Sequence, residues 1–261
     1  MSFKRLTAGA GVAAAALTGL TACGSDGDDN ALTVCTNVPF APFEERSGDD
    51  IVGFDADMMQ LLADRTDREL SWVEVDFAAI ESGSAFLAGT CDIAAAGITI
   101  TDERQEALGM SDPYFRADQA LATTTDSDVA SVDDLEGKRV GVQTATTGES
   151  YAEDLEEEKG LEVVKFDDMG SVANAMKAGS VDASIADLSN WNSFAEGESD
   201  FTVAEELPTE EYYGYAVKKD DDELLGEVND MIAAALESGE YEKIYREWIG
   251  VEYSGQLESA E

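Results

Sequence analysis

The segment 97–104 combines residue types that can bind an anion. It follows the apolar run 92–96, which indicates a buried strand, and Thr101 is placed to cap the helix that comes next. Arg104 falls in the first turn of that helix, where a cation opposes the helix dipole unless the guanidinium meets an anion. Free backbone amides, the Thr99 hydroxyl and the Arg104 fork together suit a carboxylate. The alternative is an arginine paired with an acidic neighbour on a solvated helix face.

Residues that follow other predicted strands supply a complementary set. Ligands of open α/β sheets bind beyond the carboxyl ends of the strands. Asp187 ends one strand and can hold a cation, while the rings of Phe40 and Phe77 can form apolar walls between Asp187 and Arg104. These groups suit a zwitterion, whose carboxylate meets the arginine and whose ammonium meets the aspartate. As alternatives, Asp187 caps a helix starting near Leu188, and the rings belong to the core.

Two more loops begin at the carboxyl ends of predicted strands. The turn from Gln143 to Gly148 opens a helix and offers hydroxyls and backbone amides. Thr146 or Thr147 in this turn suits the N-cap of the helix as well as it suits a ligand, so both roles stay open. Asn37 follows the first predicted strand of the chain.

The composition excludes several kinds of site. The 261 residues include 57 acidic and 16 basic side chains, with a formal net charge of −41, and no histidine. Such a surface repels nucleic acid and anionic lipid, and it suits a protein kept soluble at high salt, where screening relieves self-repulsion. Without histidine, no Ser-His-Asp or Cys-His nucleophile can form. We expect no catalytic residue, no metal site and no cofactor.

Residues 1–22 have the pattern of an export signal. Lys4 and Arg5 precede an apolar run that is too short for a permanent membrane span. The run ends in Leu-Thr-Ala-Cys, which resembles the lipobox of bacterial lipoproteins and implies a lipid thioether on Cys23. An ordinary cleaved signal is the alternative. The polar stretch 23–31 would be a flexible tether, and the predicted location is the extracytoplasmic face of the cell membrane.

Two cysteines remain, and we expect them to pair. An exported protein meets an oxidising compartment, and Cys35 and Cys91 lie at predicted strands that can be neighbours in a parallel sheet. A disulfide closing this loop would stabilise the fold by roughly 4 kcal/mol on the chain-entropy account. Two buried free thiols are the alternative.

Predicted strands and helices alternate in two successive β-α-β-α-β patterns. The first has strands at 32–36, 70–75 and 92–96 and helices at 55–66 and 77–87; the second has strands at 139–142, 161–166 and 182–186 and helices at 149–159 and 171–177. This alternation predicts parallel sheets covered by helices. The segments 88–92 and 178–182 resemble each other, since in both a glycine ends a helix and an aspartate opens a buried strand.

Two extended stretches, 119–125 and 212–217, are expected to connect the halves as a hinge, which lets the lobes close on a ligand. The terminal helices, 222–236 and 241–248, would then pack on the first lobe. The predicted fold class is α/β, with two lobes, each a mostly parallel sheet with helices on both faces, joined by a two-strand hinge. The predicted boundaries are 32–120 for the first lobe, 121–213 for the second, 214–250 for the return and 251–261 for an acidic tail.

Taken together, these segments resemble the bacterial extracellular solute-binding family 3, the type II periplasmic binding proteins of ABC importers for polar amino acids. The matching segments are 40–44, 52–57, 75–77, 96–104, 111–115, 140–142 with the Thr-Thr turn after it, and 241–250. The resemblance covers about residues 32 to 250, and it implies the type II periplasmic-binding-protein fold.

The resemblance also implies a role for each residue of the site. Arg104 would bind the α-carboxylate of an amino acid, helped by Thr99 and the turn at Thr146. Asp187 and the Gly97 carbonyl would bind the α-ammonium, and the two phenylalanine rings would flank the side chain.

The choice of amino acid would be made around Asn37 and Gln143. Relatives that take cationic amino acids commonly have Asp in place of Asn37, and a neutral amide does not offset a buried cation. Gln143 stands where glutamine-binding relatives have Lys, and Ala145 where many members have Gly. These departures rank glutamine or a similar neutral polar amino acid first, glutamate second and a basic amino acid third.

The predicted function is a substrate-binding lipoprotein that carries an amino acid to the permease and ATPase of an ABC importer. A monomer that binds no nucleic acid is expected. One alternative is a dehydratase-like enzyme on the same fold, which would need an acid such as Glu44 or Asp76 in the cleft. Another is a sensory amino-acid-binding module.

Overall fold

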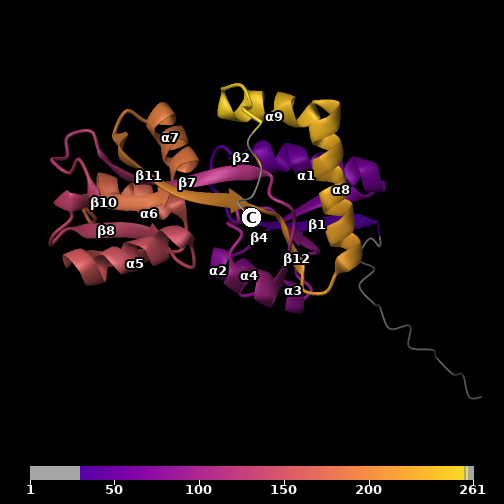
Figure 1. The fold of residues 1–261 in the computed structure, drawn as a ribbon, viewed down its shortest axis with the longest axis horizontal. Coiled ribbons are helices and arrows are strands. Elements are labelled where there is room, and N and C mark those ends of the chain that lie inside the picture. The colour runs from indigo at the N-terminus through magenta and orange to yellow at the C-terminus, as the bar shows by residue number, and fades with distance from the viewer. Residues whose placement is uncertain (1–29, 256, 258–261) are drawn as a thin grey trace, which may run out of the picture.

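The computed structural model describes residues 30–255 and 257, which form two lobes, each built on a five-stranded sheet (Figure 1). The predicted export signal, Cys23 and most of the predicted tether lie outside the described residues. Within residues 30–255 and 257, no helix is long and apolar enough to cross a membrane.

The first lobe has the strand order β4-β1-β5-β12-β6. The strands are β1 (Ala31–Thr36), β4 (Glu69–Glu74), β5 (Ile93–Ala94), β6 (Leu108–Met110) and β12 (Ala216–Lys218). β4, β1 and β5 are parallel, whereas β12 is antiparallel to both β5 and β6. β12 therefore brings the returning chain into the middle of the first sheet, as the predicted crossing requires.

Helices cover both faces of this sheet because the side chains of β1 alternate in direction. Leu32 and Val34 pack into the cluster that contains α1 (Phe54–Thr66) and α8 (Asp222–Ser238). Cys35 belongs to the cluster on the other face. The remaining elements of this lobe are the hairpin β2 (Glu45–Ser47) and β3 (Asp50–Val52), and the helices α2 (Phe77–Glu81), α3 (Ser84–Leu87), α4 (Asp102–Ala107) and α9 (Glu240–Ile249).

The single helix expected over 77–87 is wrong. Gly83 has φ of 73°, in the left-handed region, and divides the segment into α2 and α3. The apolar spacing persists across the break, because Ile80 and Phe86 both pack into the second cluster. Apolar periodicity alone therefore did not reveal the interruption.

The second lobe has the strand order β11-β7-β10-β8-β9. The strands are β7 (Phe115–Thr124), β8 (Arg139–Gln143), β9 (Glu162–Phe166), β10 (Ala183–Asp187) and β11 (Phe201–Tyr213), and the helices are η1 (Val132–Asp134), α5 (Thr147–Lys159), α6 (Met169–Lys177) and α7 (Leu188–Gly197). β10, β8 and β9 are parallel, while β7 is antiparallel to both β10 and β11. The two lobes thus share a core of three parallel strands.

The internal resemblance between the lobes has a structural basis. Gly89 and Gly179 both end a helix with a left-handed backbone, at φ of 68° and 67°. The aspartate three residues later accepts a backbone hydrogen bond from the neighbouring strand in each lobe, at 2.9 Å. Asp92 accepts it from Thr33, and Asp182 from Arg139.

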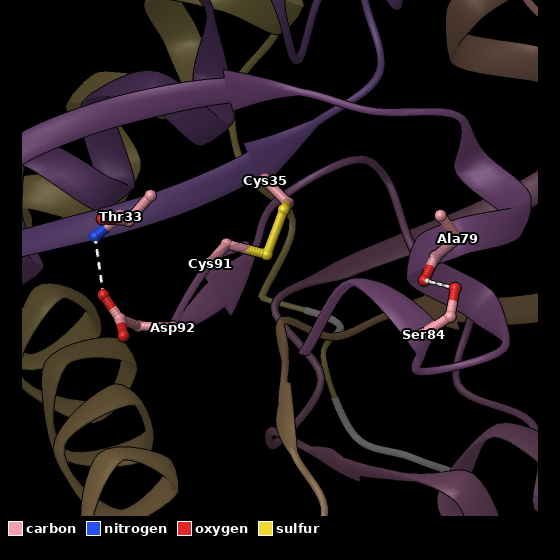
Figure 2. Close-up of a disulfide and its surroundings, with 6 residues drawn as sticks. All are labelled: Thr33, Cys35, Ala79, Ser84, Cys91 and Asp92. Carbon is pink, nitrogen blue, oxygen red and sulfur yellow. Dashed lines mark hydrogen bonds between the residues drawn. A yellow bond between two sulfur atoms is a disulfide. The ribbon is translucent and has the colours of Figure 1, made fainter. Parts of the chain in front are cut away.

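The disulfide between Cys35 and Cys91 is present, as predicted, and joins β1 to the turn two residues before β5 (Figure 2). The two Cα atoms are 5.6 Å apart. Because β1 and β5 pair through Val34 and Ile93, the disulfide ties two strands that are already neighbours.

Long antiparallel strands connect the lobes. Figure 1 shows β7 and β11 running side by side from the second lobe toward the first. β7 pairs within the second sheet from Phe115 onward, so the first crossing precedes the expected stretch 119–125. The second crossing follows Tyr213, where Gly214 donates to the Ile98 carbonyl at 2.9 Å. The loop after β5 is thereby held against the hinge.

Candidate functional site

A cavity between the lobes brings all nine predicted ligand-binding residues together. It is lined by Asn37, Phe40, Phe77, Ala96, Gly97, Thr99, Arg104, Gln143, Thr146, Thr147 and Asp187. Its volume is only about 10 Å³. Arg104 bonds to the Ala145 carbonyl and Gln143 bonds to Asn37 directly across it, so the lobes lie closed on each other. That these residues bind a ligand stays a prediction.

Arg104 is buried, with 4% of its surface exposed, and spans the two lobes. Thr101 caps α4 by accepting from the Arg104 amide at 3.2 Å. The Arg104 guanidinium donates to the Thr99 carbonyl at 2.8 Å and to the Ala145 carbonyl of the second lobe at 2.9 Å. The alternative of an arginine on a solvated helix face is therefore wrong.

The surroundings of this guanidinium keep it available for an anion. Its carbon lies 5.3 Å from the centre of the Phe77 ring. Burial lowers the pKa of Arg104, and the carboxylates of Glu81, Asp187 and Glu211 act against that shift. Since arginine titrates far above neutrality, the group stays charged. Its bonds to neutral carbonyls leave that charge without a direct carboxylate partner among the described residues.

Asp187 is the opposite pole, at the end of β10, with 8% of its surface exposed. Its side chain makes no capping bond to α7, so the alternative of a helix cap is wrong. The carboxylate accepts from the Gln119 side chain at 3.0 Å. Burial, together with the smaller effect of the negative charge of Glu211, raises the pKa of Asp187 to about 7. A cation placed beside Asp187 would favour the ionised form.

Aromatic rings form the walls of the cavity. Phe40 and Phe77 are both buried, and Phe40 stacks on the core residue Phe43 with ring centres 5.8 Å apart. Gly97 passes against this wall with φ of 53°, and a Cβ there would lie 2.4 Å from the Phe40 ring. Only glycine fits this close approach. Because Gly97 has no side chain, the backbone of the loop that carries Thr99 can form part of the cavity wall.

The far end of the cavity holds two amide side chains that pair across the lobes. Gln143 donates to the Asn37 side-chain oxygen at 2.9 Å and to the Asp167 carbonyl at 3.3 Å. Asn37 in turn donates to the Val75 carbonyl at 2.8 Å. A nitrogen donor is thus held between two oxygen acceptors, one from each lobe.

Thr146 is engaged as a helix cap. Its hydroxyl donates to the Gln143 carbonyl at 2.7 Å and accepts from the Glu149 amide at 3.1 Å. The Glu149 carboxylate accepts from the amide of Ala145, the residue before the cap, at 2.5 Å. Ala145 has φ of 65°, a strained value for a residue with a Cβ, and this backbone aims its carbonyl at Arg104.

Sequence reasoning missed Gln119 and Glu211, whereas Thr147 was one of the two threonines left open as a ligand donor. The Glu211 carboxylate accepts from the hydroxyls of Thr147 and Thr99, at 2.7 Å and 3.3 Å, and from the Gln119 amide at 3.2 Å. Gln119 lies two residues from both Ala117 and Leu121, on the same face of β7, and this spacing could have signalled an inward polar residue. Glu211 stands beside another glutamate, a pattern typical of a solvated surface, so no signal pointed to it.

Comparisons with known proteins fit this geometry. The family model described as bacterial extracellular solute-binding proteins, family 3, matches residues 32–251. The chain belongs to this family. As a family 3 solute-binding protein it has the predicted two-lobed type II periplasmic-binding-protein fold, and family membership agrees with the predicted extracytoplasmic location.

The relatives of this solute-binding protein are themselves binding proteins. A probable histidine-binding protein of Neisseria gonorrhoeae is 32% identical over 97% of this chain and 98% of its own length. The arginine-, lysine-, histidine-binding protein ArtJ of Geobacillus stearothermophilus has a TM-score of 0.79 and 31% identity, over 88% of this chain and 100% of that one. An ancestral arginine-binding protein, 33% identical, has been solved with arginine, with a TM-score of 0.79 over 84% of this chain and 98% of that one. It has also been solved with glutamine, with a TM-score of 0.78 over 85% and 99%.

Proposed function

We propose that this solute-binding protein binds a basic L-amino acid, arginine first, between its lobes and delivers it to the permease and ATPase of an ABC importer. One observation carries the proposal. Buried Arg104 and Asp187 lie in one closed cavity whose walls are aromatic, so a ligand carboxylate and ammonium would each meet an opposite charge. No other pair among the lining residues combines both charges.

The ranking of ligands reverses the one drawn from Asn37 and Gln143. Relatives named for histidine, arginine and lysine favour a basic ligand. The far end of the cavity supports this, because the Asn37 and Asp167 oxygens already hold one nitrogen donor, that of Gln143. A guanidinium that displaced the Gln143 amide would find the same two acceptors, and Arg supplies several donors in a fixed plane.

Glutamine is the second candidate, and a specific observation favours it. No carboxylate contacts Asn37 or Gln143 among the described residues, and a side-chain amide can pair with both of them as donor and acceptor. The ancestral arginine-binding protein that was solved with glutamine shows that related sites accept either ligand.

We do not propose an enzyme. The acids suggested for a dehydratase-like reaction do not line the cavity. Glu44 is fully buried in the first lobe, and Asp76 is exposed at the start of α2. A solved neighbour described as a precursor of cyclohexadienyl dehydratase is itself an amino-acid-binding protein. We propose further that the chain acts as a monomer and is tethered to the membrane by a lipid on Cys23.

A thermal-shift panel tests the proposal. Residues 24–261, which lack the predicted signal and the lipid-bearing Cys23, are heated with each of the twenty L-amino acids, and hits are followed by calorimetry. A ligand at a hundredfold excess over its Kd stabilises the folded protein by about 2.7 kcal/mol. We expect arginine, lysine or histidine to raise Tm, and glutamine to raise it less.

The matched variants are Arg104→Ala, which should lose binding, and Arg65→Ala, an exposed arginine on α1, which should keep it. An unchanged Tm with all twenty amino acids would contradict the proposed function. A response to glutamine alone would contradict the basic ligand.

A further inference from the structure

Glu211 lies behind the cavity rather than in its wall, and the backbone of β11 is distorted to place it there. The pairing of β11 with β7 shifts register between Leu207 and Glu211. Glu210 within this bulge has φ of 55°, and its amide is held by the Asp118 carboxylate at 2.9 Å. Bulges re-aim side chains, and strained residues persist only where their surroundings hold them. The bulge thus directs the Glu211 carboxylate toward the junction of the lobes.

The carboxylate meets a hydroxyl from each lobe. The Thr147 hydroxyl, on the first residue of α5 in the second lobe, lies 2.7 Å from it. The Thr99 hydroxyl of the first lobe lies 3.3 Å from it, and the two hydroxyl oxygens are 3.4 Å apart. A carboxylate only accepts hydrogen bonds, and each hydroxyl has a single proton. Both threonines therefore act as donors toward Glu211.

Gln119, like the two threonines, donates a hydrogen bond to the Glu211 carboxylate. Its amide nitrogen lies within donating distance of the carboxylates of Asp187 and Glu211, at 3.0 Å and 3.2 Å, and of the Thr147 hydroxyl oxygen, at 3.3 Å. Its side-chain oxygen is left buried without a hydrogen-bond partner among the described residues. An unpaired buried oxygen is costly, so the two carboxylates fix the orientation of this amide. The hinge strands β7 and β11 thereby supply the polar residues behind the site.

From this geometry we infer that Glu211 is a positioning residue for the ligand ammonium. By taking the protons of the Thr99 and Thr147 hydroxyls, it leaves at least one lone pair of each hydroxyl for the cavity that both threonines line, the Gln119 amide donating to the other lone pair of Thr147. The two hydroxyls then act as acceptors beside Asp187. Arg104 and backbone amides are left to hold the ligand carboxylate. This inference rests on the proposed function, and it moves the Thr99 hydroxyl from the carboxylate to the ammonium.

The test compares a ligand that has the ammonium with one that lacks it. L-arginine and 5-guanidinopentanoate, which is arginine without its α-amino group, are titrated calorimetrically into the native protein and into Glu211→Ala and Glu211→Gln. We expect Glu211→Ala to raise the Kd for L-arginine roughly tenfold to hundredfold, because the freed hydroxyls can turn their protons toward the ammonium. The Kd for 5-guanidinopentanoate should stay within about twofold of the native value, since it makes no ammonium contact.

Glu211→Gln serves as the conservative rescue. An amide oxygen still accepts from both threonines, so its Kd for L-arginine should return to within about threefold of the native value. Glu206→Ala, an exposed glutamate of the same strand, is the matched control and should behave as the native protein. Thermal melts of each variant report folding independently of the ligand.

Three results would overturn the inference alone. The first is equal weakening of both ligands by Glu211→Ala, which indicates a general effect on closure. The second is an unchanged affinity for L-arginine in that variant. The third is a Gln variant as weak as the Ala variant, which would assign the effect to charge rather than to hydroxyl direction. A native protein that binds no amino acid would overturn the proposed function and the inference together.

Discussion

At the scale of single residues, Asp187 is where ligand binding and proton binding compete. Closing the lobes over this carboxylate without a cation raises its pKa to about 7, first by burial and then by the charge of Glu211. A bound ammonium needs the ionised form. Below pH 7 the closed protein without ligand therefore carries a proton that must leave when the ligand binds.

We predict that the Kd for L-arginine rises as the pH falls from about 8 to about 5.5, because Asp187 must release its proton. Arginine is the probe of choice since its side chain does not titrate in this range. Calorimetry in two buffers of different ionisation enthalpy should show proton release on binding near pH 6. Asp187→Asn should bind more weakly at every pH and without this pH dependence. A pH-independent Kd in the native protein, or proton uptake, would contradict the role given to Asp187.

At the scale of elements, the predictable part of the site is the part that follows strands. The carboxyl ends of parallel strands meet at one edge, so Asn37, Arg104 and Asp187 could be grouped from their positions after predicted strands. Glu211 could not be assigned to the site from the sequence, because its placement depends on a bulge in the pairing of β11 with β7. The break at Gly83 was missed for a related reason, since both halves of the segment bury apolar residues in the same cluster.

A buried acidic pair links two further elements. Glu44 follows the loop after β1, and Asp55 lies in the first turn of α1; both are fully buried. Asp55 accepts from the hydroxyls of Tyr114 and Tyr215, at 2.8 Å and 3.1 Å. Burial raises the pKa of Glu44 well above its usual value, and the neighbouring Asp55 raises it further. Glu44 is therefore neutral in the folded protein at pH values where it is ionised in the unfolded chain.

A carboxyl group with a raised folded pKa makes the protein less stable as the pH rises above its unfolded pKa. Glu44→Gln removes this cost while keeping a donor for Asp55. We predict similar stability of variant and native protein near pH 4.5, and a variant that gains up to about 1.4 kcal/mol per pH unit above it. Urea melts between pH 4.5 and 8 measure the difference. Asp49→Asn, at an exposed position nearby, should show no such trend. If Glu44→Gln is less stable than the native protein at pH 8, the conclusion that Glu44 is neutral in the folded protein is wrong.

At the scale of the whole molecule, the acidic surface and the acidic poles of the site act together. The chain carries a formal net charge of −41, and in the closed protein Asp187 and Glu211 lie together beside Gln119. A cationic ligand would be attracted by this field and would relieve it locally. The same charge opposes folding at low ionic strength. Helix α5 shows this, with Asp154 and Glu157 exposed one turn apart in a run of acids.

We predict that salt stabilises this protein because acidic residues outnumber basic ones by 57 to 16. Screening shortens the Debye length from about 10 Å at 0.1 M salt to about 3 Å at 1 M, which weakens the many repulsions more than the few ion pairs. Tm should rise by several degrees with KCl over this range. The double variant Asp154→Asn with Glu157→Gln should raise Tm at low salt and gain less from KCl, since part of the repulsion is already gone. A Tm that falls with KCl, or a double variant whose salt response equals that of the native protein, would show that charge repulsion does not limit the stability of this fold.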